Sequence, residues 1–253
     1  MTRVAIVVPT LGQRLDYLEQ NLRSISSQGL DVQIVIVRPL KVSEHVDKLA
    51  ETYGAKVVDD PAEGLSRAVN VGVSMLDSSV EYFNWLGDDD FLTPESLSNA
   101  VRMFDTHEQA VLVYGNCKYL DDLDRELFVA KPGKFASRSM AFAPNKIPQP
   151  GALMRVSAFE KLGGLNEELR FAMDLDLWLR IRRLGKLIYV DAVLANYRWH
   201  KGSLSAMNGK ASFEEARRSR LSNGAYLETL LARIFDWLAL KLGVVDRNRL
   251  DRM

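Results

Sequence analysis

The apolar positions in the first half of the chain follow two alternating periods, one typical of buried strands and the other of helices. Short runs rich in β-branched and aromatic residues predict strands over 4–8, 32–37, 56–58, 82–86 and 111–115. Between them, apolar residues every three or four positions predict helices over 16–27, 46–53, 65–76 and 95–105, the last with Thr93 as N-cap and Pro94 in its first turn. This alternation indicates an α/β protein with a parallel sheet, in which ligands bind beyond the carboxyl ends of the strands.

The pattern becomes less regular after residue 120. Residues 121–150 are rich in Lys, Pro and Ser and predict a loop or short hairpin, followed by helices over 157–162 and 175–184 and a strand over 187–190. Two amphipathic helical stretches fill 213–242, with an apolar stripe made of Leu227, Leu230, Leu231, Ile234, Leu238 and Leu242. We expect this stripe to pack on the rest of the protein or on a second copy, and Trp237 beside it keeps binding to a membrane surface as the alternative.

Composition and charge narrow the function classes. The chain has 253 residues, of which 47% are hydrophobic, and its 33 basic residues balance 33 acidic ones, so nothing indicates nucleic-acid binding. The single cysteine, Cys117, excludes an internal disulfide and suits a reducing compartment. Pro9 interrupts the first apolar run, and no segment reaches the ~20 apolar residues of a membrane span. We therefore expect a cytoplasmic protein, either free or attached peripherally to the inner face of a membrane.

Three consecutive acidic residues, Asp88, Asp89 and Asp90, follow the predicted strand over 82–86. On an extended strand end, Asp88 and Asp90 point into one pocket and Asp89 points elsewhere. Two converging carboxylates either raise a pKa or bind a cation, and hard oxygen ligands favour Mg²⁺ or Mn²⁺. The alternative is a solvated acidic turn that precedes the helix starting near Pro94.

A second acidic site, Asp174 and Asp176 in the stretch MDLDLW, opens the predicted helix over 175–184. Acidic residues at a helix start interact favourably with the helix dipole, which is enough to explain either residue singly. The functional alternative is that one carboxylate projects toward the site at the strand ends and acts as a general base.

Five stretches of the chain, in this order, resemble the motifs of family 2 glycosyltransferases of the GT-A fold. They are VAIVVPTLGQRLDYLEQNLRSISSQ, EGLSRAVNVGV, YFNWLGDDDFLTPESL, IPQPGALMRVSAFEKLGGLNEELRFAMDLDLWLRIRRLG and YRWHKGSLS. The resemblance covers roughly residues 3 to 205, and ordered motifs found together are far more specific than any one of them. It implies a Rossmann-like, mostly parallel sheet flanked by helices. The GT-A domain spans 1–205, with a nucleotide-binding part of about 1–115 and an acceptor-side part of about 116–205, and a C-terminal helical extension spans 206–253.

The resemblance also implies chemistry and residue roles. The implied reaction is an inverting transfer from a nucleotide-diphospho-sugar to a hydroxyl of a saccharide or lipid-linked acceptor, with Mn²⁺ or Mg²⁺, in cell-surface polysaccharide or glycan synthesis. Asp174 takes the position of the catalytic base and Asp90 that of the principal metal ligand. The other implied roles are donor binding by Pro9, Thr10, Arg67, Asp88 and Asp89, metal binding by Asp88 and His200, and acceptor-side positions for Gln149, Asp176 and Trp178.

One position departs from the family pattern. After the second strand the family usually carries an acidic pair that helps to recognise the nucleotide base, whereas this chain has Arg38 and Pro39. A guanidinium group only donates hydrogen bonds and cannot accept one from a base imide. A UDP-sugar is the donor that the resemblance favours, but the choice of base stays open.

Three other functions are less well supported by the sequence. A catalytically silent relative that binds a sugar or nucleotide fits Arg38, but the presence of both Asp90 and Asp174 argues against it. A phosphatase of the haloacid-dehalogenase type also uses a D-x-D motif, but after its first strand. A dinucleotide-binding oxidoreductase lacks support because no G-x-G-x-x-G follows the first strand.

Overall fold

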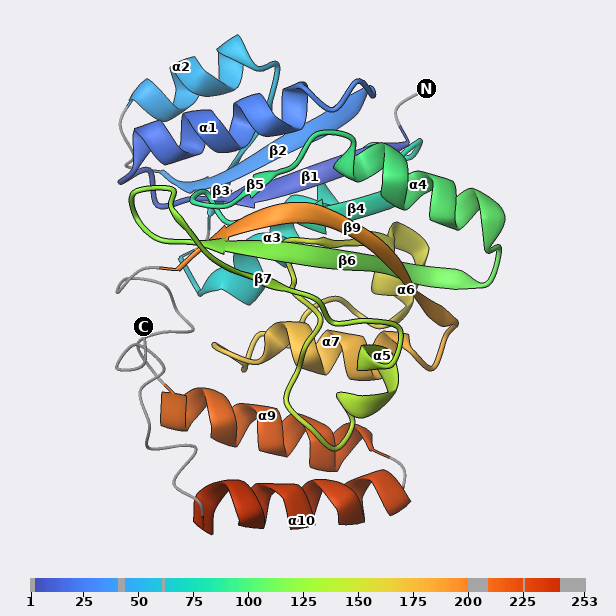
Figure 1. The fold of residues 1–253 in the computed structure, drawn as a ribbon. Coiled ribbons are helices and arrows are strands. Elements are labelled where there is room, and N and C mark those ends of the chain that lie inside the picture. The colour runs from blue at the N-terminus through green and yellow to red at the C-terminus, as the bar shows by residue number, and fades with distance from the viewer. Residues whose placement is uncertain (1–2, 41–43, 61, 200–208, 225, 242–253) are drawn as a thin grey trace.

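The N-terminal half forms a parallel sheet covered by helices. The structure is a computed structural model and describes residues 3–40, 44–60, 62–199, 209–224 and 226–241 (Figure 1). Four strands lie in the order β3-β2-β1-β4 and pair in parallel. The elements of this half are β1 (Val4–Pro9), α1 (Leu15–Ser26), β2 (Val32–Pro39), α2 (Glu44–Thr52), β3 (Lys56–Asp60), α3 (Leu65–Ser74) and β4 (Tyr82–Trp85). Each was predicted from the sequence, with differences only at the ends.

The second half continues the same sheet with mixed strand directions. β8 (Ala152–Arg155) lies antiparallel between β4 and β6 (Ala110–Leu120), so two reversals leave β6 parallel to β4. β9 (Lys186–Arg198) pairs in parallel with β6, while β5 (Phe91–Leu92) and β7 (Glu126–Ala130) add antiparallel pairs. The described residues thus form one sheet of nine strands. This arrangement confirms the α/β fold class, although β5 and β8 were not predicted.

Helix α4 (Ser96–Thr106) begins later than predicted, and Thr93 is not its N-cap. The backbone N–H of Thr93 donates to Leu194 O at 3.1 Å, and its hydroxyl donates to Val193 O at 2.5 Å. Both groups therefore extend the pairing between β5 and β9. Glu95, with a φ of 59°, precedes the first helical residue instead. The cap prediction failed because the Thr93 side chain is directed toward β9 and the helix begins two residues later than predicted for this cap, after Glu95.

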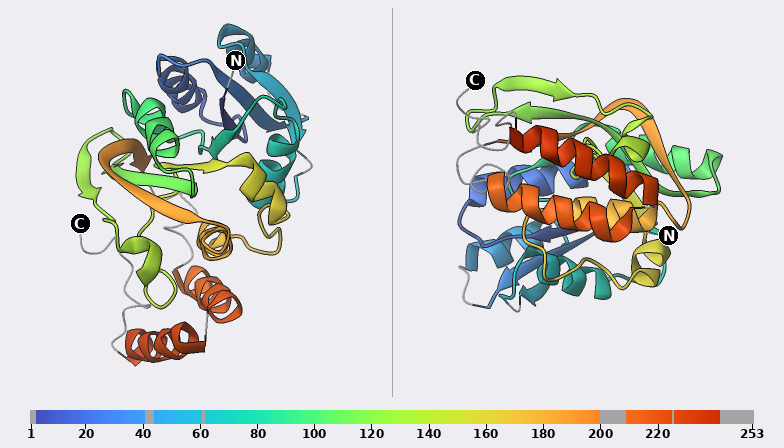
Figure 2. Two further views of the ribbon diagram at one scale, coloured as in Figure 1. Left: turned by 90° about the vertical axis from the view of Figure 1, so that its right-hand side faces the viewer. Right: turned by 90° about the horizontal axis from the view of Figure 1, so that it is seen from below.

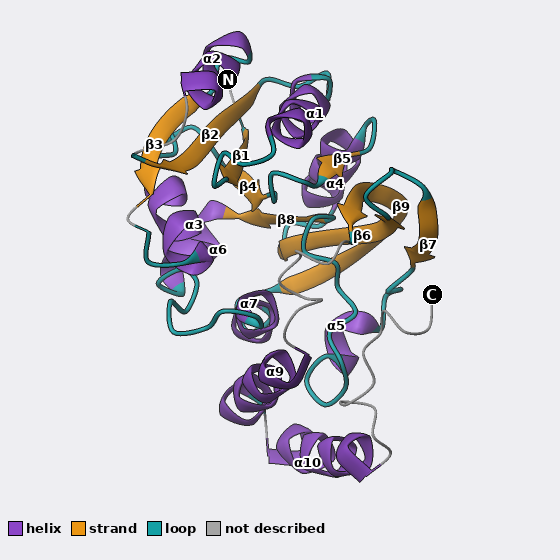
Figure 3. Cartoon of the chain, turned by 90° about the vertical axis from the view of Figure 1, so that its left-hand side faces the viewer, coloured by secondary structure: helices purple, strands orange, loops and turns teal. Residues whose placement is uncertain are grey.

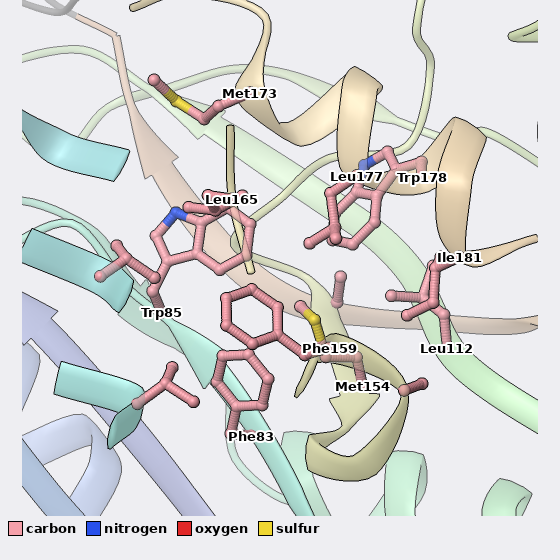
Figure 4. Packing of buried hydrophobic residues seen from close by; sticks show 14 of the residues in the cluster. Phe83, Trp85, Leu112, Met154, Phe159, Leu165, Met173, Leu177, Trp178 and Ile181 are labelled. Carbon is pink, nitrogen blue, oxygen red and sulfur yellow. The ribbon is translucent and has the colours of Figure 1, made fainter. Parts of the chain in front are cut away.

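Two apolar cores cover the two faces of the sheet. α1, α2 and α4 cover one face, and α3, α6 (Val156–Lys161) and α7 (Met173–Ile181) cover the other (Figure 3). At the centre of the second core, Trp85 of β4 stacks on Trp178 of α7 with ring centroids 6.0 Å apart (Figure 4). Trp178 is 0% exposed. This side chain thus fixes α7 to the sheet and reaches no surface, and its acceptor-side role stays a prediction.

Two C-terminal helices, α9 (Gly209–Asn223) and α10 (Tyr226–Lys241), form an outer layer beyond α7 (Figures 1 and 2). α9 packs directly on α7, and α10 packs on α9. The short helix α5 (Ala136–Ser139) follows the β6–β7 hairpin within the stretch predicted as a loop or hairpin. Within the described residues, none of the helices combines the length and apolar character that crossing a bilayer requires.

Candidate active site

The three acidic residues after β4 lie in a tight turn. The N–H of Asp90 donates to Gly87 O at 3.0 Å, which closes the turn over Gly87–Asp90. The extended geometry expected from the sequence, with Asp88 and Asp90 sharing a pocket, is therefore wrong. Instead, Asp88 and Asp89 share one cation: Arg14, just before α1, approaches Asp89 Oδ2 at 2.9 Å and Asp88 Oδ1 at 3.4 Å.

The loop after β1 holds Asp88 from the other side. The Thr10 hydroxyl donates to Asp88 Oδ2 at 2.5 Å, and the same hydroxyl oxygen accepts from the N–H of Gly12 at 2.9 Å. Pro9 ends β1 in register with Val37 of β2, so this loop leaves the carboxyl edge of the parallel strands. Two of the predicted donor-binding positions, Thr10 and Asp88, are thus brought into direct contact.

Asp90 turns inward and is almost fully buried. Its Oδ1 accepts from the backbone N–H of Arg198 at 3.0 Å. Burial, followed by the nearby charge of Asp89, raises the pKa of Asp90 well above its usual value. A Cβ on Gly87 would lie 3.0 Å from Asp89 Oδ1 and 3.3 Å from Asp90 Oδ2. A Cβ at position 87 would therefore crowd both carboxylates, which converge on this point.

This donor set suits a hard divalent cation. Mg²⁺ is typically held by one or two carboxylates together with substrate phosphates, so the converging Asp89 and Asp90 are sufficient protein ligands. Burial, and after it the charge of Asp89, raises the pKa of Asp90, and a bound cation would favour the ionised form of both carboxylates. Across the described part of the chain, no three His, Cys, Asp or Glu side chains gather in a metal-binding cluster. His200, the predicted late ligand, lies outside the described residues.

Arg198 supports the acidic turn and was not recognised in the sequence. Its guanidinium, 1% exposed as a residue, donates to Asp89 O at 2.5 Å and Gln20 Oε1 at 2.8 Å, and pairs with Asp124. It also lies over the Tyr17 ring at 3.9 Å. Although Arg198 falls within the quoted motif YRWHKGSLS, one arginine in a strand carries no pattern that distinguishes it from a surface residue.

A short segment joins the acidic turn to the second acidic site. Gln149 Nε2 donates to Trp85 O at 2.6 Å and to Asn84 Oδ1 at 2.9 Å, at the end of the strand that leads into the turn. Four residues earlier, Asn145 Nδ2 donates to Asp174 Oδ2 at 2.9 Å. Since Trp85 also stacks on α7, the strand end and the first turn of α7 are fixed side by side. Gln149 here positions the site, and its contact with an acceptor stays a prediction.

Asp174 has the properties of a general base. It is partly exposed in the first turn of α7, and its Oδ1 accepts from the N–H of Leu175 at 2.7 Å. Burial raises its pKa to about 6, against the lowering effect of its hydrogen bonds. A carboxylate with this pKa is ionised at neutral pH, yet takes up a proton more readily than an ordinary aspartate does.

Asp176 lies two residues further along α7 in a different environment. It is 5% exposed, with Oδ2 2.7 Å from Arg180 Nε and Oδ1 accepting from Asn223 Nδ2 at 3.0 Å. Both carboxylate oxygens are therefore engaged within the protein. The expected acceptor-side position of Asp176 does not fit this geometry, whereas a supporting role that ties α7 to α9 does.

Arg67, predicted to bind the donor, and Arg38, which departs from the family pattern, are both paired with acids. Arg38, at the end of β2, binds Asp47 at 2.9 Å and its register partner Asp59 of β3 at 3.2 Å. Arg67 of α3 lies 3.2 Å from Glu167 in the loop before α7. Arg38 thus binds acids of α2 and β3 at the position where the family pattern has an acidic residue. The binding of a nucleotide by Arg67 stays a prediction.

The start of α7 is capped from outside its own segment. Glu215 of α9 accepts from the backbone N–H groups of Arg170, Phe171 and Ala172, at distances of 2.7 to 3.2 Å. These N–H groups belong to the three residues that lead into α7, and a carboxylate at this end of a helix also interacts favourably with the helix dipole. The C-terminal helices are therefore part of the scaffold that places Asp174.

Glu215→Gln is expected to lower the free energy of unfolding by about 1–2 kcal/mol, because hydrogen bonds to a charged acceptor are stronger than those to an amide. The catalytic rate should fall as well, since the first turn of α7 loosens. Glu214→Gln is the matched control, because its carboxylate pairs with Arg217 on the surface at 2.8 Å. Urea unfolding of the two variants measures the difference, and equal losses would contradict the capping role.

Several known proteins are similar in sequence to this chain. The sequence model described as Glycosyl transferase family 2 matches residues 5–163. An uncharacterized glycosyltransferase of Rickettsia conorii is 25% identical over 210 residues, covering 79% of this chain and 34% of that protein. The chondroitin synthase of Pasteurella multocida is 22% identical over 240 residues, covering 89% of this chain and 24% of the synthase. The chain thus spans about a third or less of the length of these two relatives.

Solved structures show the same fold at low identity. TarS of S. aureus, residues 1–349 in complex with UDP-GlcNAc, superposes with a TM-score of 0.70 at 15% identity, covering 92% of this chain and 71% of that structure. The mannosyltransferase PcManGT of Pyrobaculum calidifontis, in complex with GDP-Man and Mn²⁺, gives a TM-score of 0.66 at 19% identity, covering 96% and 75%. Together these matches confirm the α/β transferase fold.

Proposed function

We propose that this chain, which belongs to glycosyl transferase family 2, moves a sugar with inversion from a nucleotide-diphospho-sugar to an acceptor hydroxyl. The observation that carries the proposal is that one segment, residues 145–149, contacts both Asp174 and the strand end before the acidic turn. Asn145 holds Asp174, and Gln149 holds the strand end that leads into the acidic turn. A partly exposed base therefore stands next to a cluster of carboxylates suited to a cation and a diphosphate.

On the donor side, the acidic turn and the loop after β1 supply the binding groups. Asp89 and Asp90 would hold Mn²⁺ or Mg²⁺, which when bound supplies Lewis-acid stabilisation of the charge that grows on the departing diphosphate. PcManGT holds Mn²⁺ together with GDP-Man in its crystal structure, which supports the use of a divalent cation here. Asp88 within the turn and Thr10 beside it would contact the ribose or sugar of a donor bound there.

On the acceptor side, Asp174 removes the proton from the attacking hydroxyl. With a pKa of about 6, its carboxylate is available as a base at neutral pH and keeps enough basicity to take the proton as the new bond forms. Attack on the anomeric carbon from the face opposite the diphosphate inverts the configuration, so no covalent intermediate with a second carboxylate is required. A saccharide or lipid-linked acceptor, used in cell-surface polysaccharide synthesis on the cytoplasmic side of a membrane, is the acceptor class that we propose.

A thermal-shift series with nucleotide-sugars tests donor binding. UDP-GlcNAc or GDP-mannose at about 100 Kd should raise the melting temperature by roughly 5 °C, and only in the presence of MnCl₂. Asp89→Asn should abolish the Mn²⁺-dependent part of this shift. Asp105→Asn, whose carboxylate pairs with Arg3 at 3.3 Å on the surface, should leave the shift unchanged.

The same series separates the enzyme from a catalytically silent relative. Arg14 on the acidic pair and Arg38 at the end of β2 are the features that favour a silent binding protein. Stabilisation by a nucleotide-sugar without release of nucleoside diphosphate, to water or to any acceptor, would assign that function. Absence of stabilisation by every nucleotide-sugar would reject both. The base of the stabilising nucleotide also shows which donor the Arg38 environment accepts.

A further inference from the structure

Helix α10 exposes large apolar side chains that a surface helix of a soluble protein normally buries. Leu230, Leu231, Ile234, Trp237 and Leu238 are all exposed, with Trp237 at 58% and Ile234 at 49%. Isolated apolar residues on a surface are ordinary, but five large ones on one helix form a contiguous patch. This outward patch, called here the α10 face, is where a further interaction is expected.

The acidic side chains of α10 point the opposite way. Asp236 is 4% exposed and lies 2.6 Å from Arg220 of α9, and Glu228 lies 2.6 Å from Arg182 beyond α7. A buried ion pair is costly unless both partners are present, so these two pairs fix which side of α10 faces the protein. The outward orientation of the apolar residues is therefore built into the fold.

The charges that remain around the α10 face are positive. Arg233 and Lys241 are the exposed charged residues among the described side chains of α10, and Lys241 lies 4.8 Å from the Trp237 ring. Beside the first turn of α10 opens a hollow of about 1020 Å³, whose lining includes Lys134, Arg138, Arg182, Arg183, Lys186 and a single carboxylate, Glu228. Glu228 is already paired with Arg182, and no ion pair joins the Lys134, Arg138 or Lys186 side chain to any other described residue. The cationic charge of the hollow is thus largely uncompensated.

We propose that the α10 face binds the surface of an anionic lipid bilayer, with α10 lying in the interface, Arg233 and Lys241 at the headgroups, and the basic hollow beside the first turn of α10. Apolar side chains with a tryptophan, flanked by cations and lacking outward carboxylates, match the chemistry of an interfacial helix on anionic lipid. A symmetric contact between two copies brings the same patch against itself and so opposes like charges. Lipid headgroups complement the charge instead. This inference does not depend on the transfer reaction proposed above.

Sedimentation of the full chain with vesicles tests the proposal. The protein should bind vesicles of phosphatidylcholine with about one-third phosphatidylglycerol, should bind phosphatidylcholine alone far more weakly, and should be released by high salt. The double variant Ile234→Gln/Trp237→Gln should reduce partitioning at least about tenfold, because both side chains lose their apolar contact with the bilayer. Leu40→Gln, at a residue that is 73% exposed far along the chain from α10, is the matched control and should bind as the natural protein does.

Tryptophan fluorescence gives a second measurement, which does not require a variant that has lost vesicle binding. Trp85 and Trp178 are buried, and Trp199 is half-buried against Tyr119 and Phe128, so Trp237 should dominate a blue shift on addition of anionic vesicles. Trp237→Phe should bind vesicles without most of that shift. No binding to anionic vesicles, or an equal loss in Leu40→Gln, overturns the proposal. So does a dimer in light scattering that Ile234→Gln/Trp237→Gln dissociates, which assigns the face to a second copy.

Discussion

Asp174→Asn is expected to lower kcat by about 10²–10⁴-fold, because the amide cannot accept the proton of the attacking hydroxyl. Donor affinity should change little, since the carboxylates of the acidic turn are separate from Asp174. The asparagine keeps the acceptor for the N–H of Leu175 and loses only the bond from Asn145. We therefore expect a folded protein that binds nucleotide-sugar and does not turn over, measured by nucleoside diphosphate release and by calorimetry.

The pH dependence of the reaction gives an independent check on Asp174. Burial raises its pKa to about 6, so the base is lost by protonation as the pH falls through 6, and kcat should fall on the acid side with that midpoint. Because the raised pKa means that the folded protein disfavours the ionised form, Asp174 makes a destabilising contribution above pH 6 that disappears toward pH 4. Asp176→Asn is the contrasting variant: breaking its pair with Arg180 should reduce stability. Full activity of Asp174→Asn would remove the base assignment.

Arg198→Met should destabilise the protein by about 3 kcal/mol and lower the melting temperature by roughly 6–12 °C. The substitution removes the buried donors to Asp89 O and Gln20 and leaves these acceptors without partners. The Asp89 main chain then loses its anchor, so metal-dependent nucleotide binding should weaken as well.

The matched control for Arg198 is Arg125→Met. Arg125 pairs with Asp121 at 2.6 Å, but its side chain is 72% exposed, so we expect a change within about 0.5 kcal/mol. Calorimetric unfolding distinguishes the two variants. If Arg198→Met and Arg125→Met had the same melting temperature, the hydrogen bonds of Arg198 around the acidic turn would not stabilise the protein.

The sequence predicted the fold of the first half well because strongly periodic runs formed its elements. VAIVV and VQIVIV became the buried strands β1 and β2, and the helices between them differ only at their ends. β5 and β8 have two and four residues, too few to show any period, and they are held by pairing with distant strands. The length of β9 was also missed, since only part of its 13 residues has an apolar, strand-like pattern.

For the site, the sequence predicted residue types better than their arrangement. The site roles of the acidic turn and Asp174 stay predictions. The turn over Gly87–Asp90 replaced the extended geometry, and Trp178 and Asp176 serve packing and support. Arg14, Arg198 and Glu215 were missed because each acts through a partner distant in sequence. A single charged residue shows such a partner only after folding brings the two together.

Arg14 gives the resting protein a tethered counter-ion. Its guanidinium lies 2.9 Å from Asp89 and 3.4 Å from Asp88, and its backbone is fixed at the start of α1. A divalent cation that binds these carboxylates must compete with a charge whose effective concentration is set by the chain itself. Free metal should therefore bind weakly, and metal that arrives with a diphosphate should bind better, because the phosphates offer the displaced arginine a new partner. We therefore expect the donor diphosphate to promote replacement of the Arg14 guanidinium by a divalent metal ion at these carboxylates.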